Sequence, residues 1–115
     1  MIKREDVEKF LKDFKVKLNI FQIVYRDDRG KNSQALLDLE ISPSQRTEII
    51  KAIEPENYSE GPLEEKLYDG SHMWVFGKKV KDNEVYIKIS MGSKDLPVIC
   101  ISFHIAQHKM KYPFK

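Results

Sequence analysis

The sequence predicts an α+β fold in which helices cover one face of an antiparallel sheet of about four or more strands. The first half of the chain carries apolar residues at helical spacing. The last third carries runs in which apolar and polar residues alternate, joined by short links that favour antiparallel neighbours. The 115 residues suffice for one hydrophobic core, so we expect a single domain over residues 1–115.

The composition is typical of a soluble globular protein, with 41% hydrophobic and 33% charged residues. No apolar run approaches the roughly 18–20 residues that span a membrane. The charged start of the chain lacks the apolar core of a signal peptide. The single cysteine, Cys100, can form neither an internal disulfide nor a paired-cysteine zinc site. We therefore expect a cytoplasmic location and no membrane partner.

Two amphipathic helices are predicted in the first half. The first covers residues 5–15, where apolar residues recur at i, i+3, i+4 and i+7. The second begins at Ser42-Pro43, because Ser42 is a good cap and Pro43 fits the first helical turn. Gln45 completes the spacing of a capping box, and Pro55 lies just past the expected end.

Other segments of the first 70 residues have weaker patterns. Residues 17–25 are rich in β-branched and aromatic side chains and predict a strand. Residues 26–32 predict a polar loop. Residues 33–40 predict a short helix, with a strand as the alternative. Residues 54–62 predict an acidic loop, and residues 63–68 a helical turn.

Strands are predicted at 73–76, 84–91 and 97–104, joined by links at 78–83 and 92–97. The helical stripes must bury against the apolar side of these strands. That side is expected to carry Val85, Ile87, Ile89, Met91, Ile99, Ile101 and Phe103. The free side is expected to carry Tyr86, Lys88, Ser90, Cys100, Ser102 and His104.

Metal and cofactor chemistry is not indicated by any motif. The sequence contains no glycine-rich nucleotide motif and no serine-hydrolase signature. His104 and His108 have an i, i+4 spacing that suits a metal only on a helix, whereas a strand is expected to end there. We therefore expect no metal site and no cofactor.

Cleavage of RNA without a metal requires only groups that the free side of the sheet carries. A base takes the proton of the ribose 2′-hydroxyl, an acid protonates the leaving oxygen, and cations stabilise the phosphate charge. Histidine titrates near neutrality, so His104 suits proton transfer. Lys88 suits the phosphate, and Tyr86 suits orienting it, stacking on a base or donating a proton. A purely structural role stays open for each of the three.

The C-terminal part is basic and is where an anionic partner such as RNA is expected. Residues 71–115 hold 8 Lys and Arg against 3 Asp and Glu, whereas residues 1–70 hold 12 against 15. Trp74 suits base stacking, and Lys78 and Lys79 suit phosphate contacts. The alternatives are that Trp74 packs in the core, that both lysines lie in a solvated link, and that the charge is ordinary surface charge.

Five segments follow one another in an order known from a protein family. They read NSQALLDLEI at 32–41, PENYSEG at 55–61, MWVFGKK at 73–79, NEVYIKIS at 83–90 and VICISFHI at 98–105. This order resembles MqsR-type toxins, which are small bacterial ribonucleases of toxin–antitoxin pairs. The resemblance implies a RelE-like fold, in which helices back a sheet and RNA is cut on the open face without a metal. It also implies a cognate antitoxin protein as partner.

The resemblance also implies roles for single residues. Tyr86 matches a functional Tyr of the family, and His104 falls where the family has a catalytic Lys. The chain departs from the family at Val75, where a functional Gln is expected, and at Glu60, which aligns with a Lys. The candidates to replace these two groups are His72, Lys78 and Lys79.

We therefore expect the toxin component of a type II toxin–antitoxin system that acts as an endoribonuclease, an mRNA interferase. Its substrate is expected to be mRNA, either free or on the ribosome. The alternative is a non-catalytic domain of the same fold that binds RNA or protein, which the two departures from the family permit.

Overall fold

The computed structural model describes residues 2–64, 72–93 and 95–115. The elements follow in the order α1 (Arg4–Ile20), β1 (Val24–Tyr25), η1 (Asp27–Arg29), α2 (Lys31–Leu39), α3 (Pro43–Lys51), η2 (Pro55–Asn57), β2 (Tyr58–Leu63), β3 (Met73–Val80), β4 (Asn83–Ser90) and β5 (Ile99–Ile105). The five strands form one sheet in the order β1-β5-β4-β3-β2. The predicted α+β fold is confirmed.

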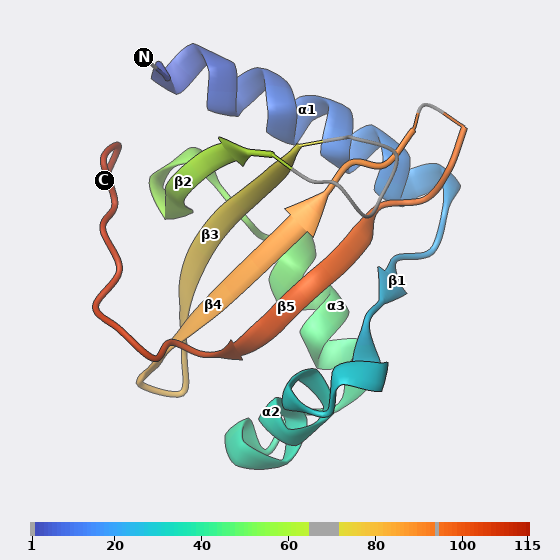
Figure 1. The fold of residues 1–115 in the computed structure, drawn as a ribbon, viewed down its shortest axis with the longest axis vertical. Helices are drawn as coiled ribbons and strands as arrows, with labels where there is room; N and C mark the ends of the chain where they lie inside the picture. The colour runs from blue at the N-terminus through green and yellow to red at the C-terminus, as the bar shows by residue number, and fades with distance from the viewer. Residues whose placement is uncertain (1, 65–71, 94) are drawn as a thin grey trace.

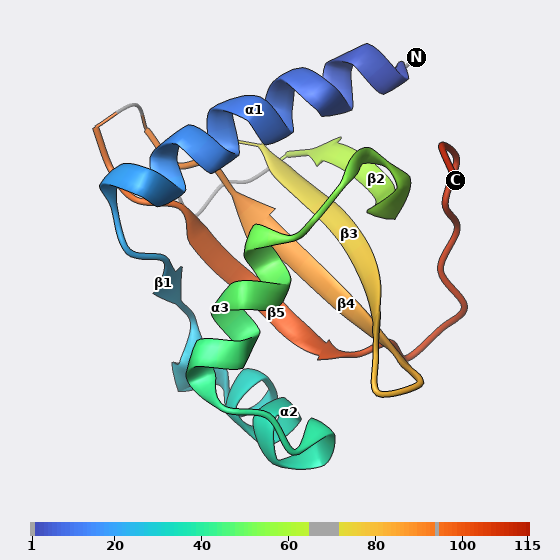
Figure 2. The same ribbon diagram turned by 180° about the vertical axis from the view of Figure 1, so that it is seen from behind.

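The helices α1 and α3 lie across one face of the sheet (Figure 1 and Figure 2). The opposite face carries no helix among the elements that the structure describes. Strands β3, β4 and β5 are antiparallel neighbours, as predicted, and β2 adds a further antiparallel strand beside β3. The short edge strand β1 pairs with β5 in parallel, so the sheet is mixed rather than purely antiparallel.

The N-terminal helix is longer than predicted. Because α1 runs on, the strand predicted at 17–25 is wrong except for β1. The ammonium of Lys17 donates hydrogen bonds to the carbonyl oxygens of Met91, Ser93 and Leu96 at 2.6–2.7 Å. These distant contacts favour the helix in a segment whose composition favours a strand.

The two short helices are confirmed. Helix α2 covers most of the segment predicted at 33–40. Helix α3 begins after Ser42, whose hydroxyl accepts a hydrogen bond from the backbone amide of Gln45 at 3.1 Å. The side chain of Gln45 accepts in return from the backbone amide of Ser42 at 2.7 Å, which completes the predicted capping box.

The acidic segment predicted as a loop at 54–62 contains a strand. In β2, Tyr58 lies opposite Phe76 and Glu60 lies opposite Val75 of β3. The Tyr58 side chain is buried, and its ring meets the Phe76 ring edge-on at a centroid distance of 6.2 Å. A buried aromatic residue therefore fixes this segment to the sheet despite its acidic character.

Strand β3 is also longer than predicted. It continues to Val80, so Lys78 belongs to the strand and not to a link. The turn into β4 consists of Lys81 and Asp82, whose φ angles are +49° and +68°. Two residues with positive φ are typical of tight hairpins. The helical turn predicted at 63–68 lies mostly outside the described residues, and its first residue ends β2.

A bulge in β5 changes which of its side chains face the helices. Lys88 pairs with Ser102, but the next residue of β4 pairs with Cys100, so Ile101 is an extra residue in β5. The alternation of faces shifts at this point. Cys100 is fully buried in the core, and the prediction that it lies on the free side is wrong. Ile99 moves to the opposite face.

The hydrophobic core lies between α1, α3 and the sheet. Its fully buried members include Val7, Phe14, Ile50, Ile53, Phe76, Val85, Ile87, Ile89 and Phe103. Both predicted helical stripes therefore pack on the predicted apolar side of β4. None of the described helices combines the length and the apolar character needed to cross a membrane.

Candidate active site

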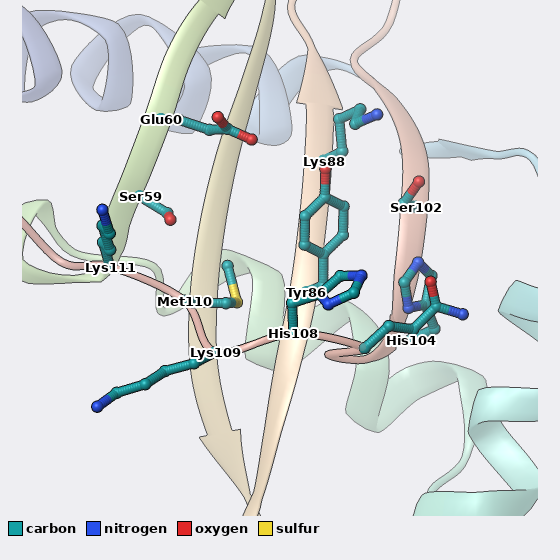
Figure 3. Close-up of a pocket in the computed structure, with 11 residues that line it drawn as sticks. Ser59, Glu60, Tyr86, Lys88, Ser102, His104, His108, Lys109, Met110 and Lys111 are labelled. Carbon is teal, nitrogen blue, oxygen red and sulfur yellow. The ribbon is translucent and has the colours of Figure 1, made fainter.

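A cavity of about 510 Å³ opens on the helix-free face of the sheet. Tyr86 of β4 lies opposite His104 of β5, and Lys88 lies opposite Ser102. The three residues predicted to carry catalysis, Tyr86, Lys88 and His104, all line this cavity (Figure 3). The other lining residues come from β2 and from the C-terminal segment, residues 106–115. They are Ser59, Glu60, Gln107, His108, Lys109, Met110 and Lys111.

The rings of Tyr86 and His104 stack across the two strands, with centroids 5.2 Å apart and planes at 14°. The Nδ1 atom of His104 lies 3.0 Å from the carbonyl oxygen of Ile105. Because a carbonyl oxygen can only accept, this contact favours a proton on Nδ1 and a lone pair on Nε2 in the neutral ring. Nε2 is therefore the nitrogen that can exchange a proton with a substrate.

Lys88 brings a positive charge to the cavity. Its ammonium lies 5.7 Å from the centroid of the Tyr86 ring, within the range of a cation–π contact. Burial raises the pKa of Tyr86, and the negative charge of Glu60 raises it further. The Tyr86 phenol therefore remains protonated at neutral pH and can donate a hydrogen bond to a phosphate oxygen.

Glu60 brings a carboxylate into the cavity from the neighbouring edge of the sheet. It lies opposite Val75 of β3, which in turn lies opposite Lys88 of β4. The Glu60 side chain extends across β3 toward β4 (Figure 3). The family resemblance marks Glu60 only as a departure, whereas in the structure its side chain lines the same cavity as His104.

The C-terminal segment forms a wall of the cavity that the sequence did not reveal. It contributes three basic side chains, His108, Lys109 and Lys111. The hydroxyl of Tyr112 donates a hydrogen bond to Glu84 of β4 at 2.7 Å, which fixes the segment against the sheet. The basic composition was the only available signal, because no strand or helix pattern marks these residues.

Gly77 of β3 lets the C-terminal segment cross close to the sheet. A β-carbon at position 77 would lie 2.2 Å from the Tyr112 hydroxyl oxygen and 2.9 Å from the Met110 sulfur. Any other residue would push the C-terminal segment away from the sheet. Gly77 also lies opposite Tyr86, so the close approach occurs beside the catalytic candidates.

Two predicted RNA-binding residues lie on the helix side of the sheet. Trp74 stacks on Phe10 of α1, with ring centroids 4.4 Å apart. This is the core-packing alternative that the sequence left open. The ammonium of Lys78 donates a hydrogen bond to the carbonyl oxygen of Ala52, just after α3, at 3.2 Å. Neither side chain reaches the cavity.

The other two predicted RNA-binding residues lie outside the cavity as well. Lys79 is exposed and lines a separate hollow with Lys109 and Lys115, on the other side of the C-terminal segment. His72 is exposed and directly precedes β3. The basic side chains that line the cavity besides Lys88 and His104 are therefore those of the C-terminal segment, His108, Lys109 and Lys111.

Among the residues that the structure describes, no group of three or more His, Cys, Asp or Glu side chains is placed to hold a metal ion. Comparison of the chain with protein-family models, with curated proteins and with solved structures finds no match.

Proposed function

We propose that this protein is a metal-independent endoribonuclease. One observation carries the proposal: two proton-exchanging groups, Glu60 and His104, line the same open cavity as the Lys88 ammonium and the Tyr86 phenol. Cleavage at a ribose 2′-hydroxyl needs a base, an acid and groups that stabilise charge on the phosphate oxygens. The cavity supplies each of these from protein side chains.

In the proposed reaction, the 2′-oxygen of RNA attacks the adjacent phosphorus and the bond from phosphorus to the 5′-oxygen breaks. Glu60 takes the proton of the 2′-hydroxyl, and the imidazolium form of His104 gives its Nε2 proton to the leaving 5′-oxygen, which leaves the neutral ring with its proton on Nδ1. The products are a 2′,3′-cyclic phosphate and a free 5′-hydroxyl. Lys88 and Tyr86 bind the phosphate oxygens, whose negative charge grows in the transition state.

The sequence supports a more specific form of the proposal, a cytoplasmic toxin of the MqsR type. Its substrate is mRNA, free or on the ribosome, and its partner is a cognate antitoxin protein. The support comes from the order of the five segments that resemble the family and from the positions of Tyr86 and His104 in the chain. Val75 is buried and supplies no polar group, so Glu60 replaces the missing function in this chain.

Cleavage of RNA by the purified protein in EDTA, with and without ribosomes, tests the proposal. We expect 2′,3′-cyclic phosphate ends, and rates lowered by about 10²-fold or more in His104→Ala and in Glu60→Gln. Glu5→Gln, which makes the same change on exposed α1, is the matched control and keeps the wild-type rate.

Equal cleavage by wild type and His104→Ala would remove His104 from the mechanism. Absence of cleavage even with ribosomes would refute the proposal that the protein is an enzyme. Salt-dependent RNA binding without cleavage would support the non-catalytic alternative. Induced expression gives a second readout. A ribonuclease toxin produced without its antitoxin stops growth, and the His104→Ala form does not.

A further inference from the structure

A second cavity, of about 340 Å³, adjoins the candidate active site. It is lined by Lys31 and Asn32 of α2 and by Ile101, Ser102 and His104 of β5. Ser102 and His104 also line the catalytic cavity. The two cavities therefore lie on either side of the same two side chains.

The N-terminus of α2 borders this second cavity. The helix has 9 residues, its N-cap is Gly30, and no side chain caps it. The first amides of a helix have no carbonyl partner within the helix and form the positive end of its dipole. Lys31 adds a positive charge at the first helical position. This end of α2 therefore offers both amide donors and positive charge to an anion.

The two acidic residues just before α2 are each engaged by an arginine. The Asp27 carboxylate accepts two hydrogen bonds from Arg46, at 2.8 and 3.1 Å. The Asp28 carboxylate accepts two from Arg26, both at 3.0 Å. Their negative charge is therefore balanced locally, and it opposes an anion at α2 only weakly.

Ser102 supplies an independent indication of a ligand. The residue is only 8% exposed, and no group among the described residues forms a hydrogen bond with its hydroxyl. The hydroxyl oxygen is not enclosed by protein, so it is open to the two cavities that the residue lines. The Ser102 hydroxyl lines both cavities and is therefore placed to donate to a ligand oxygen that enters between β5 and α2.

We propose that the second cavity binds a phosphate group of the RNA strand, next to the phosphate that is cleaved. That the bound phosphate is a neighbour of a cleaved one rests on the proposed ribonuclease function. The Lys31 ammonium, the Ser102 hydroxyl and the free amides at the start of α2 contact the phosphate oxygens. The RNA backbone then runs from α2, past His104, to the basic C-terminal segment.

Titration of the ¹⁵N-labelled protein with inorganic phosphate, at constant ionic strength against chloride, tests the site directly. We expect saturable shifts of the amide resonances of Lys31, Asn32, Ser33 and Ser102. Lys31→Ala weakens this binding by about fivefold. Lys12→Ala, which removes an exposed lysine from α1, is the matched control and leaves it unchanged. Shifts that do not saturate, or that saturate only in residues 108–111, overturn the site.

Adjacency to the scissile phosphate is tested with a 2′-deoxy dinucleotide, which lacks the attacking hydroxyl. An added terminal phosphate, at the 5′ or the 3′ end, tightens its binding to the wild type by about fivefold or more. This gain disappears in Lys31→Ala.

The two proposals fail in different ways. A protein that cuts RNA but shows no gain from the added phosphate keeps the ribonuclease function and loses this site. A protein with saturable phosphate shifts but no RNA cleavage keeps an anion site and loses its assignment to RNA.

Discussion

The phenol ring of Tyr86 stacks on the imidazole of His104 across β4 and β5, at a centroid distance of 5.2 Å. The strand register places the two residues opposite each other. The stack restrains the plane of the imidazole, and the Nδ1 atom is engaged in a hydrogen bond with the Ile105 carbonyl oxygen. Both contacts leave Nε2 for the substrate, so the catalytic candidate is oriented before RNA binds.

Two substitutions at Tyr86 separate the stack from the hydroxyl. We expect Tyr86→Phe to keep the stack and to lower RNA cleavage by about tenfold, because only the phosphate donor is lost. Tyr86→Leu loses both and lowers cleavage by about 10²-fold or more. The ring-proton resonances of His104 should move in Tyr86→Leu and stay in Tyr86→Phe. Equal rates and equal spectra for the two variants would show that the stack does not position His104.

Gly77→Ala should release the C-terminal segment without unfolding the sheet. The new β-carbon collides with the ends of the Tyr112 and Met110 side chains, which can move away, and not with backbone. We expect faster trypsin cleavage at Lys109 and Lys111 in Gly77→Ala, with the urea midpoint of unfolding little changed. Tyr112→Phe, which removes the hydroxyl that bonds Glu84 and the Met110 sulfur but adds no atom at the crossing, should show a smaller increase. Unchanged trypsin cleavage in Gly77→Ala would contradict the tight crossing.

Asn32→Ala should destabilise the protein by about 2–3 kcal/mol. Asn32 is 2% exposed and donates to the carbonyl oxygens of Arg26 and Ile101 at 3.0 and 2.9 Å. Its side-chain oxygen accepts from the Phe103 amide at 3.0 Å. The substitution leaves these backbone groups without their partner. Urea unfolding measures the loss, with exposed Asn19→Ala as the control, and a change below about 0.5 kcal/mol would contradict the role of Asn32.

Stability should fall at alkaline pH because of Cys100. Burial raises the pKa of the Cys100 thiol to about 12, whereas a thiol in the unfolded chain titrates at about 8.5. The folded protein therefore keeps a proton that the unfolded chain loses. This contribution is complete below about pH 8.5 and is lost as the pH rises toward 12.

The measurement is the urea midpoint at pH 8 and at pH 10.5, in wild type and in Cys100→Ala. The variant is less stable at pH 8, since it loses buried volume, but its stability falls less between the two pH values. Burial also raises the pKa of Tyr112, which adds to the same alkaline trend and is common to both proteins. An equal fall in both proteins would mean that Cys100 does not contribute.

Local patterns in the sequence predicted a large part of this molecule. The start of α3 could be predicted because a capping box involves residues three positions apart. The apolar side of β4 was readable because alternation along one strand is local. The same alternation, applied to two neighbouring strands, predicted that Tyr86, Lys88 and His104 share one face of the sheet. In the structure they line one cavity.

The remaining features depend on contacts between residues far apart in the chain. The bulge at Ile101 moves Cys100 into the core, and the alternation along β5 alone gives no sign of it. Glu60 enters the cavity only because β2 joins the sheet, and the basic C-terminal residues do so only because Gly77 leaves room for Tyr112. Short-range periodicity encodes the fold class and the shared face of Tyr86, Lys88 and His104, so both could be predicted from the chain. Tertiary packing decided which further groups complete the site, because long-range pairing and steric fit have no local pattern.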